Sequence, residues 1–253
     1  MKIVSFNVNG LRAILKKDFL GFIEAYKPDI LGLQETKIQQ AQIPNEIEGL
    51  QGYHKFWDFA EKAGYSGTCL LSKDKPKKVS YDIGDSTFSK EGRIILAEYD
   101  KFALFNIYFP NGKKDDERLK YKLGFYDQFL VYIEKLRKKQ KNIIVMGDFN
   151  TAHQDIDLTH PKANEEFSGF LPIERAWIDS FISKGYVDTF RYFDKNPLQY
   201  SWWTYRLNAR QKNVGWRIDY CFVTTELMPK VKSAFIWKDV FGSDHCPVGI
   251  EIK

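Results

Sequence analysis

A chain of 253 residues, 43% apolar and 16% aromatic, is long enough to bury a full core within one domain, and we expect residues 1–253 to form one. Acidic and basic residues are interspersed, and the 17 glycines and nine prolines are scattered, which excludes disordered, collagen-like and coiled-coil classes. The net charge of +5 is compatible with an anionic partner, but it could equally serve only to keep the protein in solution. Three cysteines without a C-x-x-C pair predict buried free thiols in a reducing compartment. The strand-like start at Met1 and the absence of a long apolar run predict an intracellular protein without a membrane partner.

The chain opens with the pattern of a β-α-β unit. A strand is predicted at residues 2–7, a helix follows from Leu11 to Tyr26, and a second strand covers 29–34. Both strands run directly into polar residues, Asn7 and Glu35. Open α/β sheets build their sites at the carboxyl ends of strands, so these two side chains are candidates for function.

The rest of the chain predicts a second sheet and further helices. Apolar side chains recur at helical spacing over 116–139, and a β-branched strand at 143–146 ends in Gly147-Asp148-Phe149-Asn150. The other predicted elements are a helix at 172–184 and strands at 67–72, 93–99, 102–109, 218–224, 230–237 and 246–252. Together they predict two mixed sheets packed face to face with helices outside, and with strand ends from both halves meeting at one edge.

Seven polar side chains lie at or beside strand ends or in short loops: Asn7, Glu35, Asp148, Asn150, Asp219, Asp244 and His245. Carboxylates and amides are hard oxygen ligands that suit Mg²⁺ or Mn²⁺, whereas few histidines and no paired cysteines argue against a closed zinc site. Such a metal points to phosphate chemistry, in which Asp148 orients or deprotonates water and His245 stabilises the transition state. Taken singly, three of these positions also have a purely structural explanation. Glu35 would be a solvated strand end, residues 147–150 a turn, and residues 243–245 a capped loop.

Basic and aromatic residues alternate over 198–218, which contains no acid. Cations for phosphates beside flat faces for bases or sugars are typical of a nucleic-acid surface, although Trp203 is equally well explained by packing. These residues are Tyr200, Trp202, Trp203, Tyr205, Arg206, Arg210, Lys212, Trp216 and Arg217. A second basic cluster, Lys113 to Lys122, is diluted by three acids and is interpreted as a solvated helix start.

Six blocks of sequence resemble the exonuclease III and apurinic/apyrimidinic endonuclease family over nearly the whole chain. The blocks are residues 5–12 (SFNVNGLR), 33–37 (LQETK), 106–112 (NIYFPNG), 147–150 (GDFN), 208–220 (NAR, then NVGWRIDY from 213) and 242–247 (GSDHCP). The resemblance implies the DNase I-like four-layer α/β sandwich. Phe6 stands where relatives usually have tryptophan, and Asn9 where some have aspartate.

The resemblance also implies roles for individual residues. Glu35 would be the principal Mg²⁺ ligand with Asn7 and Asp244, while Asp148 and Asn150 would position the attacking water or hold a second metal. Tyr108 would contribute its phenol to the scissile phosphate, and His245, paired with Asp219, would bind a phosphate oxygen in the transition state. Trp202, Trp216 and Ile218 would form a pocket for the flipped base-less sugar. Asn111, Arg206, Arg210 and Lys114 are further expected substrate contacts, of which Lys114 and Arg206 match variable positions that wedge into the duplex.

These expectations describe a Mg²⁺-dependent hydrolase, with Mn²⁺ as a substitute, that cuts DNA on the 5′ side of an abasic site and leaves a 3′-hydroxyl and a 5′-deoxyribose phosphate. We expect 3′-to-5′ exonuclease or 3′-end cleaning beside it, duplex DNA with abasic sites or 3′-blocked ends as partner, a monomer, and a cytoplasmic or nucleoid-associated location. The alternatives are a phosphoesterase of the same fold acting on lipid or inositol phosphates, and a non-catalytic nucleic-acid-binding protein.

Overall fold

The computed structural model describes all residues, 1–253, and contains two mixed six-stranded sheets. The first has the order β11-β12-β1-β2-β4-β3 and the second β5-β6-β7-β8-β10-β9. In each sheet one central pair is parallel, β1 with β2 and β7 with β8, and the other pairs are antiparallel. The strands are β1 Lys2–Asn7, β2 Ile30–Gln34, β3 His54–Asp58, β4 Thr68–Ser72, β5 Lys78–Ser80, β6 Ile94–Glu98, β7 Ala103–Tyr108, β8 Ile143–Asp148, β9 Tyr186–Asp188, β10 Asp219–Thr224, β11 Val231–Ile236 and β12 Val248–Ile252.

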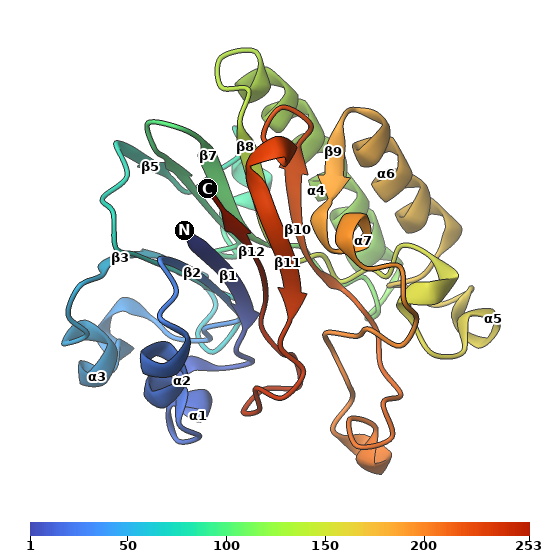
Figure 1. The fold of residues 1–253 in the computed structure, drawn as a ribbon. Coiled ribbons are helices and arrows are strands. Elements are labelled where there is room, and N and C mark those ends of the chain that lie inside the picture. Colours follow the sequence, from blue (N-terminus) through green and yellow to red (C-terminus); the bar gives the residue numbers. More distant parts are fainter.

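Helices cover the outer face of each sheet, so the molecule has four layers (Figure 1). The α-helices are α1 Leu11–Leu15, α2 Phe19–Tyr26, α3 Asn45–Glu48, α4 Asp116–Arg137, α5 Pro161–Asn164, α6 Pro172–Ser183 and α7 Thr189–Phe193. The 3-10 helices are Gln40–Gln42, Ser86–Phe88, Asp155–Asp157, Arg206–Asn208 and Met228–Lys230. Helices α1 to α3 pack on the first sheet, and α4 and α6 on the second. The predicted DNase I-like α/β sandwich is confirmed by this layering and by the solved structures described below.

Three apolar layers hold the sandwich together. Aliphatic side chains such as Ile3, Leu104 and Ile144 fill the space between the sheets, while Phe125, Phe129 and other aromatic rings join the second sheet to α4 and α6. Removal of this apolar surface from water is the main stabilisation of such a core. The three cysteines are buried and unpaired, as predicted. None of the helices is both long and apolar enough to cross a bilayer.

The predicted elements are confirmed with two kinds of difference. The predicted helix from Leu11 to Tyr26 is two helices, because Asp18 adopts a left-handed backbone with φ of 60° between α1 and α2. Three short strands, β3, β5 and β9, were not predicted. They lie at sheet edges, where pairing with one neighbour fixes strands whose sequence pattern is weak.

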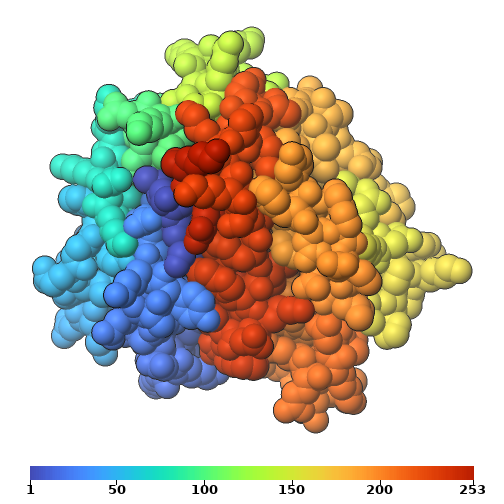
Figure 2. Space-filling view, in the orientation of Figure 1, coloured from blue at the N-terminus to red at the C-terminus, as the bar shows by residue number.

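Both ends of the chain lie side by side in the first sheet. The Met1 ammonium donates to the Ile252 carbonyl at 2.8 Å, and Figure 1 shows N and C next to each other. In Figure 2 the C-terminal segment, in red, lies between the blue N-terminal segment and the orange segment before it. The chain therefore brings its C-terminal loops beside residues from its start.

Candidate active site

Parallel strands deliver four of the predicted side chains to one edge of the sandwich. Asn7 ends β1 and Glu35 directly follows β2, while Tyr108 ends β7 and Asp148 ends β8. Because β8 pairs antiparallel with β10, Asp219 at the start of β10 lies opposite Asp148. The two sheets meet at this edge.

Asn7 joins the two sheets by a forked hydrogen bond. Its Nδ2 donates to Glu35 Oε1 at 3.0 Å and to Asp148 Oδ2 at 2.9 Å. Lys37 Nζ forms an ion pair with Glu35 Oε2 at 2.8 Å. Burial alone would raise the pKa of Glu35, but the Lys37 ammonium, the Asn7 amide and the His245 cation together hold that pKa below its usual value. Glu35 is therefore a carboxylate at neutral pH.

Asp148 is the buried centre of the site, with 1% of its surface exposed. Burial raises its pKa, and the nearby Asp219 carboxylate adds to that effect, while the His245 cation opposes it. The Asn150 backbone N–H donates to Asp148 Oδ1 at 2.7 Å and fixes the carboxylate orientation. Asn150 adopts a left-handed backbone with φ of 51°, which asparagine tolerates better than most residues.

His245 is held by an acid, as the resemblance implied. Its Nδ1 lies 2.8 Å from Asp219 Oδ2, which also accepts from the Ser201 hydroxyl at 2.7 Å, and its Nε2 lies 3.9 Å from Asp148 Oδ2. Burial disfavours the imidazolium, but the Asp219 carboxylate together with those of Asp148 and Asp244 raises the pKa of His245 to about 10. His245 is thus a cation whose Nε2–H faces the site.

Replacing Asp219 with asparagine is expected to lower the pKa of His245 from about 10 by about 1–3 pH units, because the paired charge is lost. The imidazolium then deprotonates at a lower pH, so the alkaline fall of any activity that needs it moves to lower pH. Titration of the His245 ring by NMR in both proteins measures the change. An unchanged pKa would show that Asp219 does not hold the charge.

Arg93 supports Tyr108, and sequence reasoning missed it. Its guanidinium lies 4.5 Å from the Tyr108 ring centroid and donates to the Tyr108 carbonyl at 2.9 Å. Arg93 itself forms an ion pair, with its Nε 2.6 Å from Glu91 Oε2. Burial raises the pKa of the Tyr108 phenol, and the Glu35 carboxylate adds to the effect, so the phenol is neutral and donates a proton. Nothing in the sequence around Arg93 marks it as buried.

A cavity of about 270 Å³ opens beside these groups. Its lining residues are Asn9, Glu35, Asn111, Lys113, Asn150, Gly169, Trp202, Trp216, Ile218, Asp244 and His245. Trp202 Nε1 donates to Asp244 Oδ2 at 3.1 Å, and Asn9 Nδ2 donates to Asp244 Oδ1 at 2.9 Å. The two indoles meet edge to face at 6.4 Å between ring centroids. The cavity thus has acids and amides in its lining, and they directly adjoin an apolar wall of two indoles.

Of the four further residues expected to contact substrate, the structure places only one in the cavity lining. Asn111 lines the cavity and donates to Asn150 Oδ1 at 3.0 Å. Arg210 instead holds a loop, because its two Nη atoms donate to four carbonyls between Lys238 and His245. Lys114 and Arg206 are exposed outside the cavity. The contacts of all four residues with substrate stay predictions. Arg210 also has a structural role, because it holds the loop from Lys238 to His245.

Two further interpretations can be compared with the structure. Trp203 is buried, with its Nε1 donating to Asn213 Oδ1 at 3.1 Å, which favours packing over stacking on a nucleic acid. The interpretation of residues Lys113 to Lys122 as a solvated helix start is wrong at Lys122. This side chain is fully buried, and its Nζ lies 2.6 Å from Glu174 Oε1. The partner lies 52 residues further along the chain, so local charge spacing could not reveal it.

The sequence profile of the Endonuclease/Exonuclease/phosphatase family matches residues 4–245 of this chain. The chain belongs to this family. Among similar members, an exodeoxyribonuclease of Bacillus subtilis is 44% identical over the full length of both chains. The DNA repair nuclease APEX1 of Danio rerio is 42% identical, over 98% of this chain and 81% of its own.

Solved structures of family members share the fold. An AP endonuclease from Archaeoglobus fulgidus has a TM-score of 0.91 and 27% identity, covering 100% of this chain and 99% of its own. A 3′ phosphatase from Neisseria, bound to product DNA hairpin, has a TM-score of 0.93 and 26% identity, with the same coverage. The two paired sheets of this chain therefore have the same overall fold as these solved structures.

Proposed function

We propose that this protein is a Mg²⁺-dependent DNA repair hydrolase that cuts the backbone on the 5′ side of abasic sites, with Mn²⁺ as a substitute. One observation carries the proposal: carboxylates, an imidazolium and two indoles line the same cavity. The names of the relatives, exodeoxyribonuclease and DNA-(apurinic or apyrimidinic site) endonuclease, support it. The 3′ phosphatase from Neisseria supports an accompanying 3′-end-processing activity. We further propose that residues 1–253 act as one domain and a monomer.

The donor set fits a hard divalent cation. Carboxylate oxygens of Glu35 and Asp148 lie within 4.8 Å of each other, and Asn7 contacts both. Oxygen donors of this kind, supplemented by water, are what Mg²⁺ prefers. We assign Glu35 as the main ligand, with Asn7 and Asp244 beside it and with Asp148 and Asn150 available to a second ion. When bound, the cation would neutralise charge on the phosphate and stabilise the leaving oxygen.

The remaining chemistry falls to side chains around the cavity. Asp148, whose pKa is raised by burial, takes the proton of the attacking water and is held toward it by Asn150. His245 donates from Nε2 to a non-bridging phosphate oxygen, and Asp219 keeps it charged. The neutral Tyr108 phenol donates to the same phosphate group.

The lining of the cavity supports binding of base-less sugars. Trp202, Trp216 and Ile218 provide an apolar surface against which a deoxyribose ring can pack. An abasic nucleotide also needs no base to be unpaired before it leaves the helix. Selectivity then arises from fit and from the low cost of extrusion.

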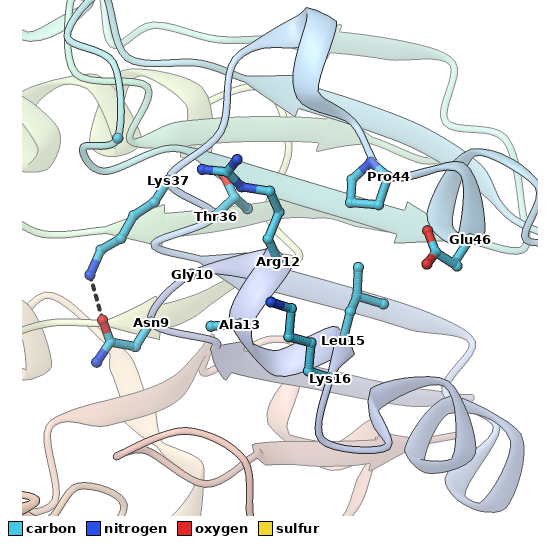
Figure 3. A pocket seen from close by; sticks show the side chains of 11 residues that line it. Asn9, Gly10, Arg12, Ala13, Leu15, Lys16, Thr36, Lys37, Pro44 and Glu46 are labelled. Atoms are coloured by element: carbon cyan, nitrogen blue, oxygen red, sulfur yellow. Dashed lines mark hydrogen bonds between the residues drawn. The ribbon is translucent and has the colours of Figure 1, made fainter.

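A basic groove next to the cavity suits the DNA backbone. Figure 3 shows Arg12, Lys16 and Lys37 around it, and Asn9, which also lines the cavity, accepts a hydrogen bond from Lys37. Its volume is about 730 Å³, and Glu46 is its one acidic residue. Cations along such a groove neutralise successive phosphates.

The experiment is cleavage of two matched duplexes, one abasic and one intact, with Mg²⁺ and with EDTA. The proposal expects Mg²⁺-dependent incision at the abasic site at least about 100-fold faster than cleavage of the intact duplex. Equal rates on both duplexes would contradict selection by the cavity. No incision, together with release of phosphate from inositol phosphates or lipid headgroups, would favour a phosphoesterase.

Replacing Glu35 with glutamine is expected to raise the Mg²⁺ concentration for half-maximal incision at least about tenfold, because one anionic ligand is lost. The change keeps side-chain volume. Calorimetric titration with Mn²⁺ measures the metal affinity of the parent and of the Glu35 variant directly, without turnover of substrate. Glu24→Gln, on the exposed face of α2, is the control and should leave both values unchanged. Unaltered metal affinity in the Glu35 variant would remove Glu35 from the ligand set.

A further inference from the structure

A lysine amine lies over the apolar wall of the cavity. Lys113 Nζ is 5.0 Å from the ring centroid of Trp216 and 5.4 Å from that of Trp202. The backbone that carries it is fixed, because the Lys113 N–H donates to Asn111 Oδ1 at 2.8 Å and Asn111 is bonded to Asn150. The residue is exposed as a whole, yet its amine end lies against the two indoles.

This amine differs from the other lysine amines around the site. Lys37 Nζ is paired with Glu35, and Lys122 Nζ donates to three acceptors within 2.8 Å. Lys113 Nζ makes no hydrogen bond or ion pair, and its contacts are the two indole faces. Contact with a π face attracts the cation but leaves the nitrogen free to react once it loses its proton. Burial lowers the pKa of Lys113, which increases the fraction of free amine at neutral pH.

The proposed substrate carries a group that such an amine attacks. A natural abasic sugar interconverts between a closed ring and an open chain with an aldehyde at C1′. A neutral amine adds to an aldehyde to give a carbinolamine, which loses water to form an imine. The nitrogen supplies the electron pair of the new C–N bond, its two hydrogens and the aldehyde oxygen leave as one water molecule, and no oxidant or reductant is needed.

We propose that Lys113 captures the C1′ aldehyde of an abasic sugar held against Trp202 and Trp216, as a reversible imine that requires no metal. The inference rests on the proposed function for the occupant of the cavity. The imine would hold an abasic site when metal is scarce and would release it by hydrolysis. It is a reaction separate from phosphodiester hydrolysis, because it forms a C–N bond at C1′ through Lys113 and breaks no P–O bond.

Borohydride reduction tests the proposal, because hydride converts an imine into a stable amine link. The protein in EDTA is mixed with a duplex that carries one natural abasic site, reduced, and run on a denaturing gel. The same duplex with a tetrahydrofuran analogue has no aldehyde and serves as the substrate control. We expect a covalent protein–DNA complex with the natural site alone and, after digestion, mass-spectrometric mapping of the link to Lys113.

Two variants distinguish a reaction of the Lys113 amine from a general effect of positive charge near the site. Lys113→Arg keeps the cation over the indoles but cannot form this imine, and it should lower the trapped yield at least about tenfold. Lys120→Met removes an exposed lysine from the nearby helix α4 and should trap as the parent does. Equal trapping by Lys113→Arg, or a link mapped to another residue, overturns the proposal.

Incision of the tetrahydrofuran duplex with Mg²⁺, measured in parallel, distinguishes the two proposals. Incision without any trapping overturns the imine and leaves the proposed hydrolase intact. Trapping through Lys113 without incision supports the capture site and contradicts the proposed hydrolase. Absence of both contradicts both.

Discussion

Replacing Asp148 with asparagine is expected to lower kcat for abasic-site incision by about 10³–10⁴-fold, the usual loss when a general base is removed. Asparagine keeps the shape of the side chain and can still accept the Asn150 N–H, which donates at 2.7 Å. It cannot take a proton from water. The change also removes one of the two carboxylates in the cluster of metal-capable groups.

Affinity for abasic duplex should remain within about threefold, because the groove and the indoles that we propose to contact DNA are unchanged. Single-turnover kinetics and a binding titration in EDTA measure the two quantities. Asp127→Asn, on the exposed face of α4, is the matched control. An Asp148→Asn protein that retains a tenth or more of the parental rate would contradict the role of Asp148 as base.

Replacing Lys122 with methionine is expected to lower the free energy of unfolding by about 3–5 kcal/mol, because it leaves a buried charge without its partner. Lys122 and Glu174 both have 0% exposed side chains and lie 2.6 Å apart. Lys122 also donates to the Asn150 carbonyl and the Thr151 hydroxyl, at 2.8 and 2.7 Å. Urea unfolding of the parent and variant gives the value.

A second substitution checks the cause of that loss. Glu174→Gln in the Lys122→Met background removes the stranded charge and should recover part of the stability, although either substitution alone is destabilising. Glutamine keeps an acceptor for the Gly169 and Leu171 N–H groups, which donate to Glu174 at 2.6 and 3.0 Å. Lys120→Met is the surface control and should change stability by less than about 0.5 kcal/mol. A double variant less stable than Lys122→Met would contradict the charge explanation.

The fold was predictable where periodicity is strong. The helix predicted at 116–139 is observed as Asp116–Arg137, because its apolar stripe and the Asp115 cap are both local signals. The break at Asp18 was not predictable, because the apolar spacing continues across it while the backbone turns left-handed. The edge strand His54–Asp58 was missed because its pairing with β4 is a tertiary contact.

The site was predictable in part for a geometric reason. Two parallel pairs of strands carry Asn7, Glu35, Tyr108 and Asp148 to one edge, and strand ends are visible in sequence. Asp219 was named at a strand end and paired with His245 through the resemblance, but its position opposite Asp148 depends on an antiparallel pairing that the sequence does not show. Arg93 and Lys122 were missed because a buried charge has the same letter in the sequence as an exposed one, and its partner comes from another element.

The central claim is tested most directly by mapping the ends produced from a duplex with one tetrahydrofuran abasic analogue in Mg²⁺. The account predicts a single cut on the 5′ side of the analogue, which leaves a 3′-hydroxyl that a DNA polymerase extends and a downstream strand that retains the sugar phosphate. The cut should be absent in EDTA. A cut on the 3′ side, a 3′ end that cannot be extended, or an intact duplex in Mg²⁺ would contradict it.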